Sequence, residues 1–283
     1  MHHDDIIRRA AEVLKTEAPA LDKNSLREYV RPFLNARERY LAAAEEAGAP
    51  LYLFDEAALV KRAEEFRGTF QAVIPDVHCY YAIKSNYHSF FLQTLSRIGY
   101  GFDVSSGEEL RRAIEHGPGG LLFSGPGKTR EELRLACTVA KRVTILIDSF
   151  GELDRLEAVA GQAGVTMTAG VRVTVEDRGL WRKFGIPLDR LAEFLTKAHA
   201  CSHVRVEGLH YHTSWNMDTT QHETFLGRLG RQVQSLPAEY INELSFLDMG
   251  GGFWPYEGEW LHASVTPAGR LRQCVTPDEL PGM

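Results

Sequence analysis

The sequence predicts an α/β protein with a parallel sheet, in the form of a (β/α)8 barrel. Short apolar segments rich in β-branched and aromatic residues alternate with helix-like segments about seven times after residue 49. Strict alternation of this kind indicates parallel strands that are joined by helices. Polar residues or glycines also stand where the predicted strands end, and in a barrel those ends form one ring. An open doubly wound sheet is the alternative that the alternation alone allows.

The composition of the chain excludes several classes of protein. Its 283 residues are 44% hydrophobic and 25% charged, which is typical of a globular protein. The net charge of -6 provides no basic surface, so we expect no nucleic-acid partner. No apolar segment is long enough to cross a membrane, and the N-terminus does not resemble a signal peptide. We therefore expect a cytoplasmic protein without a membrane partner, whose four widely spaced cysteines are free thiols.

The first part of the chain predicts a helical extension, residues 1–48, ahead of a barrel at residues 49–283. Apolar residues recur at helical spacing after Asp4 and Asp5, and acidic residues are favoured at a helix start. A second helix is expected before residue 48. A short strand at 51–54 then opens the alternating region.

The remaining elements follow in order along the chain. Strands are expected at 77–85, 99–106, 121–125, 142–149, 166–175, 203–215 and 243–253. Helices are expected at 56–69, 90–98, 107–117, 128–140, 151–162, 188–199 and 218–236. Gly117 is expected to end one helix, because glycine readily adopts the backbone conformation that terminates a helix. Since barrels carry their chemistry at the carboxyl ends of the strands, these ends locate the candidate site.

Lys84 ends the apolar segment "CYYAIKS" and is the first candidate for chemistry. A neutral lysine amine attacks carbonyl groups and forms a Schiff base. The interior of a barrel would lower the pKa of the amine and favour that neutral form. A solvated lysine at a strand end is the alternative interpretation.

The segment "LDMGGGF" predicts an anion site at another strand end. Gly250, Gly251 and Gly252 follow Asp248 and a short apolar run. Consecutive glycines allow backbone N–H groups to approach an anion closely, and phosphate is the favoured anion. A flexible turn is the alternative.

Two histidines in "GLHYHTSW" allow two kinds of site. His210 and His212 are two residues apart, so both are expected on one side of a strand. The pair could bind a metal ion, with Asp148 or Asp248 as further ligands. Alternatively, one imidazole could lie against an aromatic cofactor. Histidines of the core or of the surface remain the third interpretation.

Arg172, within the apolar segment "AGVRVT", is a charge that needs an anionic partner if it is buried. That partner would be a carboxylate or a phosphate, and the possible carboxylates are Asp103, in "GFDV", and Glu108, at the start of the next helix. Glu108 could instead interact with the positive end of that helix.

Taken together, these segments resemble the pyridoxal 5'-phosphate (PLP)-dependent decarboxylases of the alanine-racemase-fold family, which act on diaminopimelate, ornithine, lysine or arginine. The resemblance covers roughly residues 50–256. The matching segments, in order, are "YAIKSN", "GFDVSSGEEL", "LLFSGPGKTREEL", "VTILIDSFGEL", "VRV", "KFGI", "GLHYHTS" and "LDMGGGF".

The resemblance implies PLP as the cofactor and a role for each matching residue. Lys84 would hold PLP through a Schiff base and His212 would stack on its ring, so these are the expected catalytic residues. Together with Lys84 and His212, the expected cofactor-binding residues are Asp103, Arg172, Ser214, Gly250, Gly251 and Gly252. No metal is implied.

The sequence departs from the family pattern in two places. Trp215 occupies the position of a family serine near the phosphate, so either Ser214 makes that contact or the contact is lost. The Glu-Pro-Gly-Arg motif and the C-terminal β-domain of the family have no match after the glycines. We therefore expect a barrel that is incomplete at its last strand, in a fragment, a natural short form or a chain completed by a partner.

The implied function is decarboxylation of a basic or diamino acid, a small-molecule substrate, by a homodimer. The alternatives are a non-catalytic or partner-completed PLP-binding protein and an amino-acid racemase. A metal-dependent barrel hydrolase that uses His210 and His212 is the remote alternative.

Overall fold

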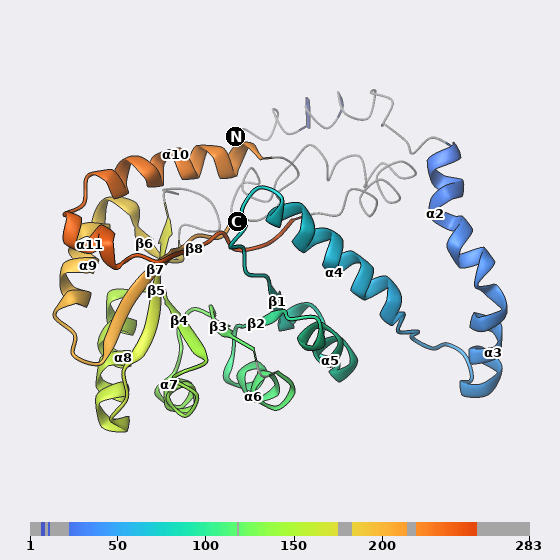
Figure 1. The fold of residues 1–283 in the computed structure, drawn as a ribbon, viewed down its shortest axis with the longest axis horizontal. Helices are drawn as coiled ribbons and strands as arrows, with labels where there is room; N and C mark the ends of the chain where they lie inside the picture. The colour runs from blue at the N-terminus through green and yellow to red at the C-terminus, as the bar shows by residue number, and fades with distance from the viewer. Residues whose placement is uncertain are drawn as a thin grey trace.

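The computed structural model describes residues 23–117, 119–174, 183–213 and 219–253, together with Ile7, Arg8 and Ala11. Its centre is a parallel sheet with the strand order β1-β2-β3-β4-β5-β7-β8, and the short strand β6 pairs with β5 (Figure 1). The strands are β1 (Tyr80–Ala82), β2 (Gly101–Val104), β3 (Leu121–Phe123), β4 (Val143–Ile147), β5 (Met167–Thr174), β6 (Ile186–Pro187), β7 (Val204–His210) and β8 (Phe246–Asp248).

The strand order decides between the two predicted architectures. Strands that are neighbours along this path are also consecutive in the chain, with β6 set to one side. A doubly wound sheet reverses its order at one point, and no reversal occurs among the described strands. The described sheet is therefore part of a (β/α)8-type barrel, as the sequence predicts.

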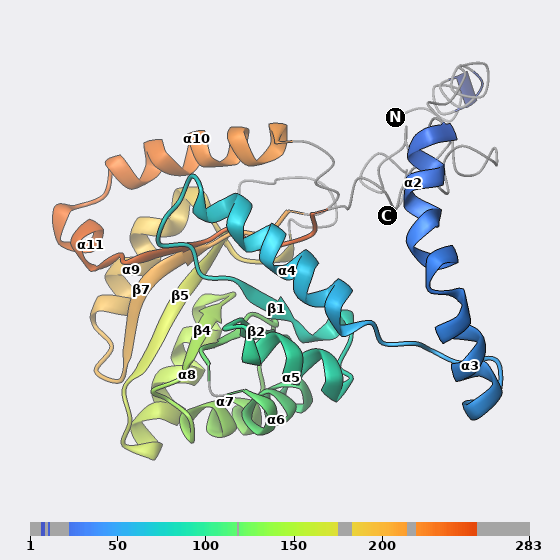
Figure 2. The same ribbon diagram turned by 45° about the vertical axis from the view of Figure 1, so that its right-hand side comes forward.

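The helices follow the strands in the predicted alternation. Figures 1 and 2 show α5, α6, α7 and α8 side by side along one face of the sheet. The described helices are α2 (Lys23–Asn35), α3 (Arg37–Ala47), α4 (Glu56–Gln71), α5 (Ser89–Arg97), α6 (Gly107–His116), α7 (Arg130–Cys137), α8 (Phe150–Ala163), α9 (Leu191–His199), α10 (Thr220–Gln234) and α11 (Ala238–Glu243). Gly117 is the C-cap of α6, as expected.

Three successive helices that follow β2, β3 and β4 begin with the same type of cap. The hydroxyl groups of Ser106, Thr129 and Ser149 accept backbone N–H groups in the first turns of α6, α7 and α8. Such caps satisfy N–H groups that have no partner within the helix. They fix the chain direction at the sheet edge where the candidate site lies.

The core lies between the sheet and its outer helices. Strand β4 is buried almost along its whole length, as is usual for parallel strands covered on both faces. The helices turn one apolar side inward, with buried residues three or four positions apart. These residues are Leu110 and Ala113 of α6, Leu133 and Ala136 of α7, and Leu153, Leu156 and Val159 of α8.

Phe246 of β8 fills the inner side of the sheet. A Cβ atom on Gly208 would lie 2.3 Å from its ring, and one on Gly170 would lie 2.9 Å from it. Both glycines therefore leave room for the aromatic ring between β5, β7 and β8. The same three strands place Arg172, His210 and Asp248 in one row, because Arg172 pairs with His210 and His210 with Asp248.

The predicted strand at 51–54 is wrong: residues 51–55 form no strand in the structure. Phe54 instead packs on Phe90 and Phe91 of α5, with ring centroids 5.6 Å and 5.0 Å apart. The apolar side chain is thus partly covered by a helix, and no strand pairs with its backbone among the described residues. The predicted strand at 77–85 is also shorter than expected, since β1 ends at Ala82.

The second helix expected before residue 48 is divided into α2 and α3, which are separated at Ala36. Helix α3 has no buried residue, and Figures 1 and 2 both show α2 and α3 standing apart from the sheet. The boundary after residue 48 stays a prediction. Within the described part of the chain, no helix has the length and apolar character needed to cross a membrane.

Candidate functional site

The candidate site is built at the carboxyl ends of the strands, where the predicted residues meet. Lys84 lies in the 3-10 turn η1 (Ile83–Ser85) directly after β1, and its side chain is exposed. Asp103 lies next to it on β2, since Ala82 pairs with Asp103. The charge of Lys84 lowers the pKa of Asp103 and also that of His212, which follows β7. The strand ends therefore deliver these three residues to one place.

Asp103 is a carboxyl group that titrates near neutral pH. Burial raises its pKa to about 6, and the negative charge of Asp248 acts in the same direction, while the Ser124 hydroxyl and Lys84 oppose both. The Oδ1 atom is buried and has no hydrogen-bond partner among the described residues. An unpartnered buried oxygen is costly, which makes this atom a candidate contact for a bound polar group.

Asp248 ends β8 and carries a negative charge in the middle of the site. Its Oδ2 atom lies 2.8 Å from Nδ1 of the buried His210, and its Oδ1 atom accepts the N–H of Gly250 at 2.8 Å. Burial would raise the pKa of Asp248, but the adjacent His210 and the N–H of Gly250 outweigh it and hold the pKa below its ordinary value. Asp248 is therefore ionised at neutral pH.

His212 is a neutral imidazole at neutral pH. Burial lowers its pKa to about 4, and the positive charges of Arg172, His210 and Lys84 act in the same direction. Its Nδ1 atom accepts the N–H of Gly251 at 3.2 Å, so the proton of the neutral ring lies on Nε2. A neutral flat ring beside the strand ends is suited to packing against an aromatic cofactor.

The glycine segment is shaped by close backbone contacts. Gly250 has φ +70°, and a Cβ atom there would lie 2.7 Å from both His212 Nδ1 and the Tyr211 carbonyl oxygen. Only glycine fits without strain. In this structure the N–H groups of Gly250 and Gly251 donate to Asp248 and His212. The expected contact of these N–H groups with a phosphate stays a prediction.

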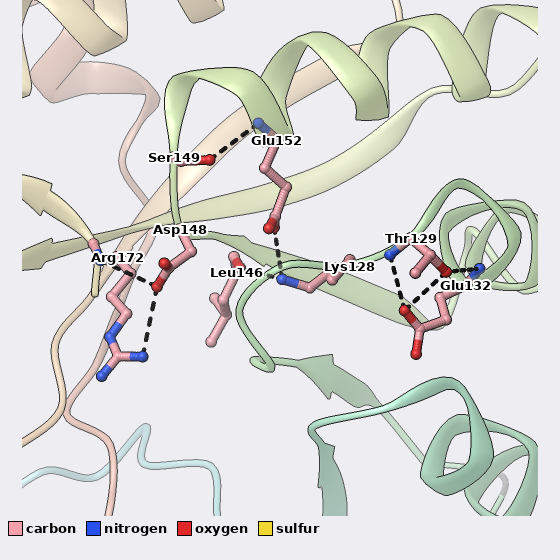
Figure 3. A network of polar contacts seen from close by, with 9 residues as sticks. Lys128, Thr129, Glu132, Leu146, Asp148, Ser149, Glu152 and Arg172 are labelled. Carbon is pink, nitrogen blue, oxygen red and sulfur yellow. Dashed lines mark hydrogen bonds and ion pairs between the residues drawn. The ribbon is translucent and has the colours of Figure 1, made fainter. Parts of the chain in front are cut away.

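Arg172 has a different partner from the one the sequence predicts. Its Nη1 atom lies 3.6 Å from Asp148 Oδ1 (Figure 3). Its guanidinium group lies 4.8 Å from the ring centroid of Phe184. The expected partners were Asp103 and Glu108. Asp103 lies on β2, three strands away from β5, and Glu108 contacts Arg111 and Arg112 of its own helix.

A buried ion pair beside the site was not predicted. The side chains of Lys128 and Glu152 are both fully buried, and Lys128 Nζ lies 2.7 Å from Glu152 Oε1 (Figure 3). Lys128 belongs to the segment "SGPGKTREEL", where it looks like an ordinary polar residue ahead of a helix. The only signal in the sequence is its place directly after a strand end and a Pro-Gly turn.

The predicted phosphate contact of Ser214 and the alternative metal site at the two histidines remain to be placed in the structure. Ser214 lies outside the described residues, as do Trp215 and Cys274. Within the described ranges, no group of three or more His, Cys, Asp or Glu side chains is arranged to hold a metal ion. Strand β7 ends at His210, so His210 and His212 do not share one strand face.

The donor set fits PLP, a phosphorylated aromatic aldehyde. An exposed lysine amine stands at the end of β1, and a neutral imidazole and an unpartnered buried carboxyl oxygen lie near it. The close approach at Gly250 leaves no space for a side chain between the glycine segment and His212. Schiff-base chemistry, ring packing and polar contacts are the functions that PLP sites require.

Known proteins share this fold. The chain aligns with diaminopimelate decarboxylase from M. jannaschii in co-complex with L-lysine, with a TM-score of 0.67 and 21% identity, over 86% of this chain and 61% of that one. At this identity the likeness shows the fold alone.

Related sequences share part of this chain's length. Diaminopimelate decarboxylase of Vibrio cholerae is 34% identical over 224 residues, which are 74% of this chain and 52% of that protein. The 2-[(L-alanin-3-ylcarbamoyl)methyl]-2-hydroxybutanedioate decarboxylase of Staphylococcus aureus is 27% identical over 212 residues, 71% of this chain and 52% of that protein. The chain thus spans about half the length of these curated relatives.

One family of proteins matches most of the chain. The pyridoxal binding domain of the pyridoxal-dependent decarboxylases matches residues 56–267, which is most of the chain. This range includes every predicted site residue from Lys84 to Gly252. It confirms the resemblance found in the sequence and, with it, the expected cofactor, PLP. The chain belongs to the pyridoxal-dependent decarboxylase family, of which it carries the pyridoxal binding domain.

Proposed function

We propose that this chain binds PLP at the carboxyl edge of its sheet and serves the decarboxylation of a basic or diamino acid. The observation that carries the proposal is the meeting of Lys84, Asp103 and His212 at the strand ends: Ala82, at the end of β1, pairs with Asp103 of β2. The charge of Lys84, which follows β1, acts on both Asp103 and His212. When bound, PLP supplies an electron sink for the electron pair that remains when carbon dioxide leaves the substrate.

Each residue of the chain has a separate task in this proposal. Lys84 offers the amine that holds the cofactor, and the neutral ring of His212 packs against it. Arg172 and the glycine segment bind its polar substituents. Asp103 holds a proton at Oδ1 below pH about 6 and carries a negative charge above it, next to Lys84.

The chemical class of the substrate is also a proposal. The Vibrio cholerae and Staphylococcus aureus relatives are both decarboxylases, but their names give different substrates. Diaminopimelate is a diamino acid, in agreement with the expectation from the sequence. We further propose that the protein is a homodimer in the cytoplasm. Light scattering of the purified chain tests the oligomeric state, and cell fractionation tests the localisation.

A second candidate function is PLP binding without turnover, or turnover only with a partner. The tests below therefore measure cofactor attachment and turnover separately. A racemase that uses the same cofactor is the third candidate. Release of carbon dioxide separates the first function from the other two, and inversion of the α-carbon without that release identifies a racemase.

The attachment of the cofactor is tested first. The chain is mixed with PLP, treated with borohydride and digested, and the modified peptide is identified by mass spectrometry. We expect the label on Lys84, its loss in Lys84→Ala, and full labelling in Lys197→Ala, which changes an exposed lysine of α9. A label on another lysine, or no label, rejects the proposed site.

Turnover is tested next with the chain alone. Lysine, ornithine, arginine and diaminopimelate are supplied one at a time, and the carbon dioxide released is measured. Release from at least one of them that disappears in Lys84→Ala supports the decarboxylase. Labelling of Lys84 without release from any substrate supports the second function.

A further inference from the structure

The Lys128–Glu152 pair is the most deeply buried charged group among the described residues, and stability alone explains it poorly. Both side chains are fully buried, and Lys128 Nζ also lies 5.2 Å from the ring centroid of Phe123. Burial lowers the pKa of Lys128, while the charges of Glu152, Asp148 and Asp103 oppose this. Apolar residues of the same size often replace a buried ion pair without loss of stability.

The contacts of Lys128 enclose one turn of the chain. Its Nζ atom donates to the carbonyl oxygen of Leu146 and to Glu152 Oε1, each at 2.7 Å. Leu146 lies near the end of β4, and Glu152 lies in the first turn of α8. The ammonium group therefore connects the two ends of the β4–α8 turn. Asp148 lies between Leu146 and Glu152 in the sequence, and its carboxylate points toward Arg172 (Figure 3).

Asp148 in turn holds two parts of the candidate site. Its Oδ1 atom accepts the backbone N–H of Gly185 at 3.1 Å and lies 3.6 Å from Nη1 of Arg172. Gly185 itself lies against Arg172, because a Cβ atom on it would be 3.0 Å from the Arg172 carbonyl oxygen. A shift of Asp148 would therefore move both the guanidinium group and the segment that follows Phe184.

The position of Lys128 is fixed from the opposite side. Thr129 and Glu132 form a capping box at the start of α7, and Glu132 Oε1 also accepts the N–H of Gly107 at 2.7 Å. Gly107 is the first residue of α6. The contacts thus run through three neighbouring strand-to-helix turns and end on Asp148 and Arg172 beside β5.

We propose that Lys128, together with Glu152, is a positioning residue that fixes Asp148 and through it Arg172 and the backbone at Gly185. Neither residue touches the cofactor or the substrate in this role. The proposal extends the proposed function because Arg172 is one of its binding residues. It is tested by a measurement that needs neither PLP nor substrate, so its failure is distinguishable from failure of that function.

The test compares hydrogen exchange at Gly185 with exchange at Ile145 in the core of β4. Lys128→Met leaves Glu152 buried without its partner, whereas the double variant Lys128→Met/Glu152→Leu has no buried charge at this place. Lys197→Met is the matched control, because Lys197 forms an exposed pair with Asp154. Asp148→Ala removes the acceptor of the Gly185 N–H, so it gives the largest increase in Gly185 exchange, with which the other variants are compared.

We expect the Gly185 amide to exchange about tenfold faster relative to Ile145 in both Lys128 variants, and at the original rate in Lys197→Met. In a variant that is only less stable, hydrogen exchange of the Gly185 and Ile145 amides becomes faster by the same factor. If the double variant keeps the original ratio of Gly185 to Ile145 exchange, the positioning role is rejected. If Lys128→Met does not fold, the double variant alone decides the question.

Discussion

The imidazole of His210 lies 2.8 Å from the carboxylate of Asp248, on neighbouring strands whose register pairs these two residues. The carboxylate also accepts the N–H of Gly250, which begins the glycine segment. Its charge raises the pKa of Asp103 on the other side of the site and that of His212. Asp248 thus acts on charged and titratable groups at the ends of two other strands, β2 and β7.

Removing the charge of Asp248 should lower two pKa values at once. In Asp248→Asn, the pKa of Asp103 falls from about 6, because a repelling negative charge is gone. The pKa of His212 falls below about 4, because an attractive charge is gone. Both are measured by NMR titration of the carboxyl carbon and the imidazole. Asp189→Asn, at an exposed carboxylate, should change neither, and unchanged values in Asp248→Asn would contradict the assignment.

The stability of the chain should depend on pH through two opposing groups. Asp103 has a pKa of about 6 when folded and 3.8 ordinarily, so the unfolded chain loses this proton first and stability falls as pH rises between these values. His212 has a pKa of about 4 when folded and 6.5 ordinarily, so stability falls as pH decreases from 6.5 towards 4. Each effect is worth roughly 2–3 kcal/mol.

The single variants should separate these effects. Asp103→Asn removes the cost of a buried charge, so it should be more stable than the original chain at pH 7 and should lose more stability towards pH 4. His212→Gln should show the reverse, with less loss in acid. Urea unfolding at several pH values measures both. Parallel pH curves for both variants and the original chain would refute the assigned titrations.

Gly250 should not tolerate a side chain. Gly250→Ala places a Cβ atom 2.7 Å from His212 Nδ1 at a backbone φ of +70°. Gly164, at the end of α8, has φ +67° and open space around it. Gly164→Ala should cost about 1–2 kcal/mol from backbone strain, and Gly250→Ala about 1–3 kcal/mol more from overpacking. Equal losses in urea unfolding would show that His212 moves aside freely.

The stacking of Arg172 on Phe184 should be measurable as a coupling energy. Arg172→Lys keeps the charge beside Asp148 but loses the flat guanidinium group, and Phe184→Leu removes the ring. A double-mutant cycle in urea should give a coupling of about 0.5–2 kcal/mol. A value near zero would mean that the contact contributes nothing to the position of Arg172.

The alternation in the sequence predicts parallel strands joined by helices, because a parallel sheet needs a crossover between each pair, and the polar residues at the strand ends favour the consecutive order of a barrel. Because the carboxyl ends of parallel strands lie at one edge of the sheet, the sequence also predicts that residues at the ends of β1, β2 and β7 meet. The positions of the strand ends were predicted less accurately, because Lys84 lies past β1 in a 3-10 turn and His212 lies past β7. Strand propensity alone does not show where hydrogen bonding to a neighbour stops.

Partners of charged residues were predicted less well, for a physical reason. Arg172 was matched with acidic residues by motif, but the register pairs Val171 of β5 with Ile147 of β4, which brings Asp148 beside Arg172. The consecutive strand order would have predicted this pair. Lys128 could not be found in this way, because its burial depends on a turn that folds back over β4.

Residues 51–54 show the opposite error. Their β-branched and aromatic character predicts a strand, but a strand also needs a partner backbone. Among the described residues, the side chain of Phe54 contacts α5 instead. Local propensity is therefore overruled by packing at this place.

The consecutive order of the strands also has a consequence for how the molecule forms. Each strand can join the sheet beside its immediate predecessor in the chain, so most pairings close short loops and can follow synthesis from the ribosome. The pairing of His210 with Asp248 is the last of the series, since β8 is the final described strand. The charge of Asp248 therefore reaches the site only when β8 docks, after the other described strands have paired.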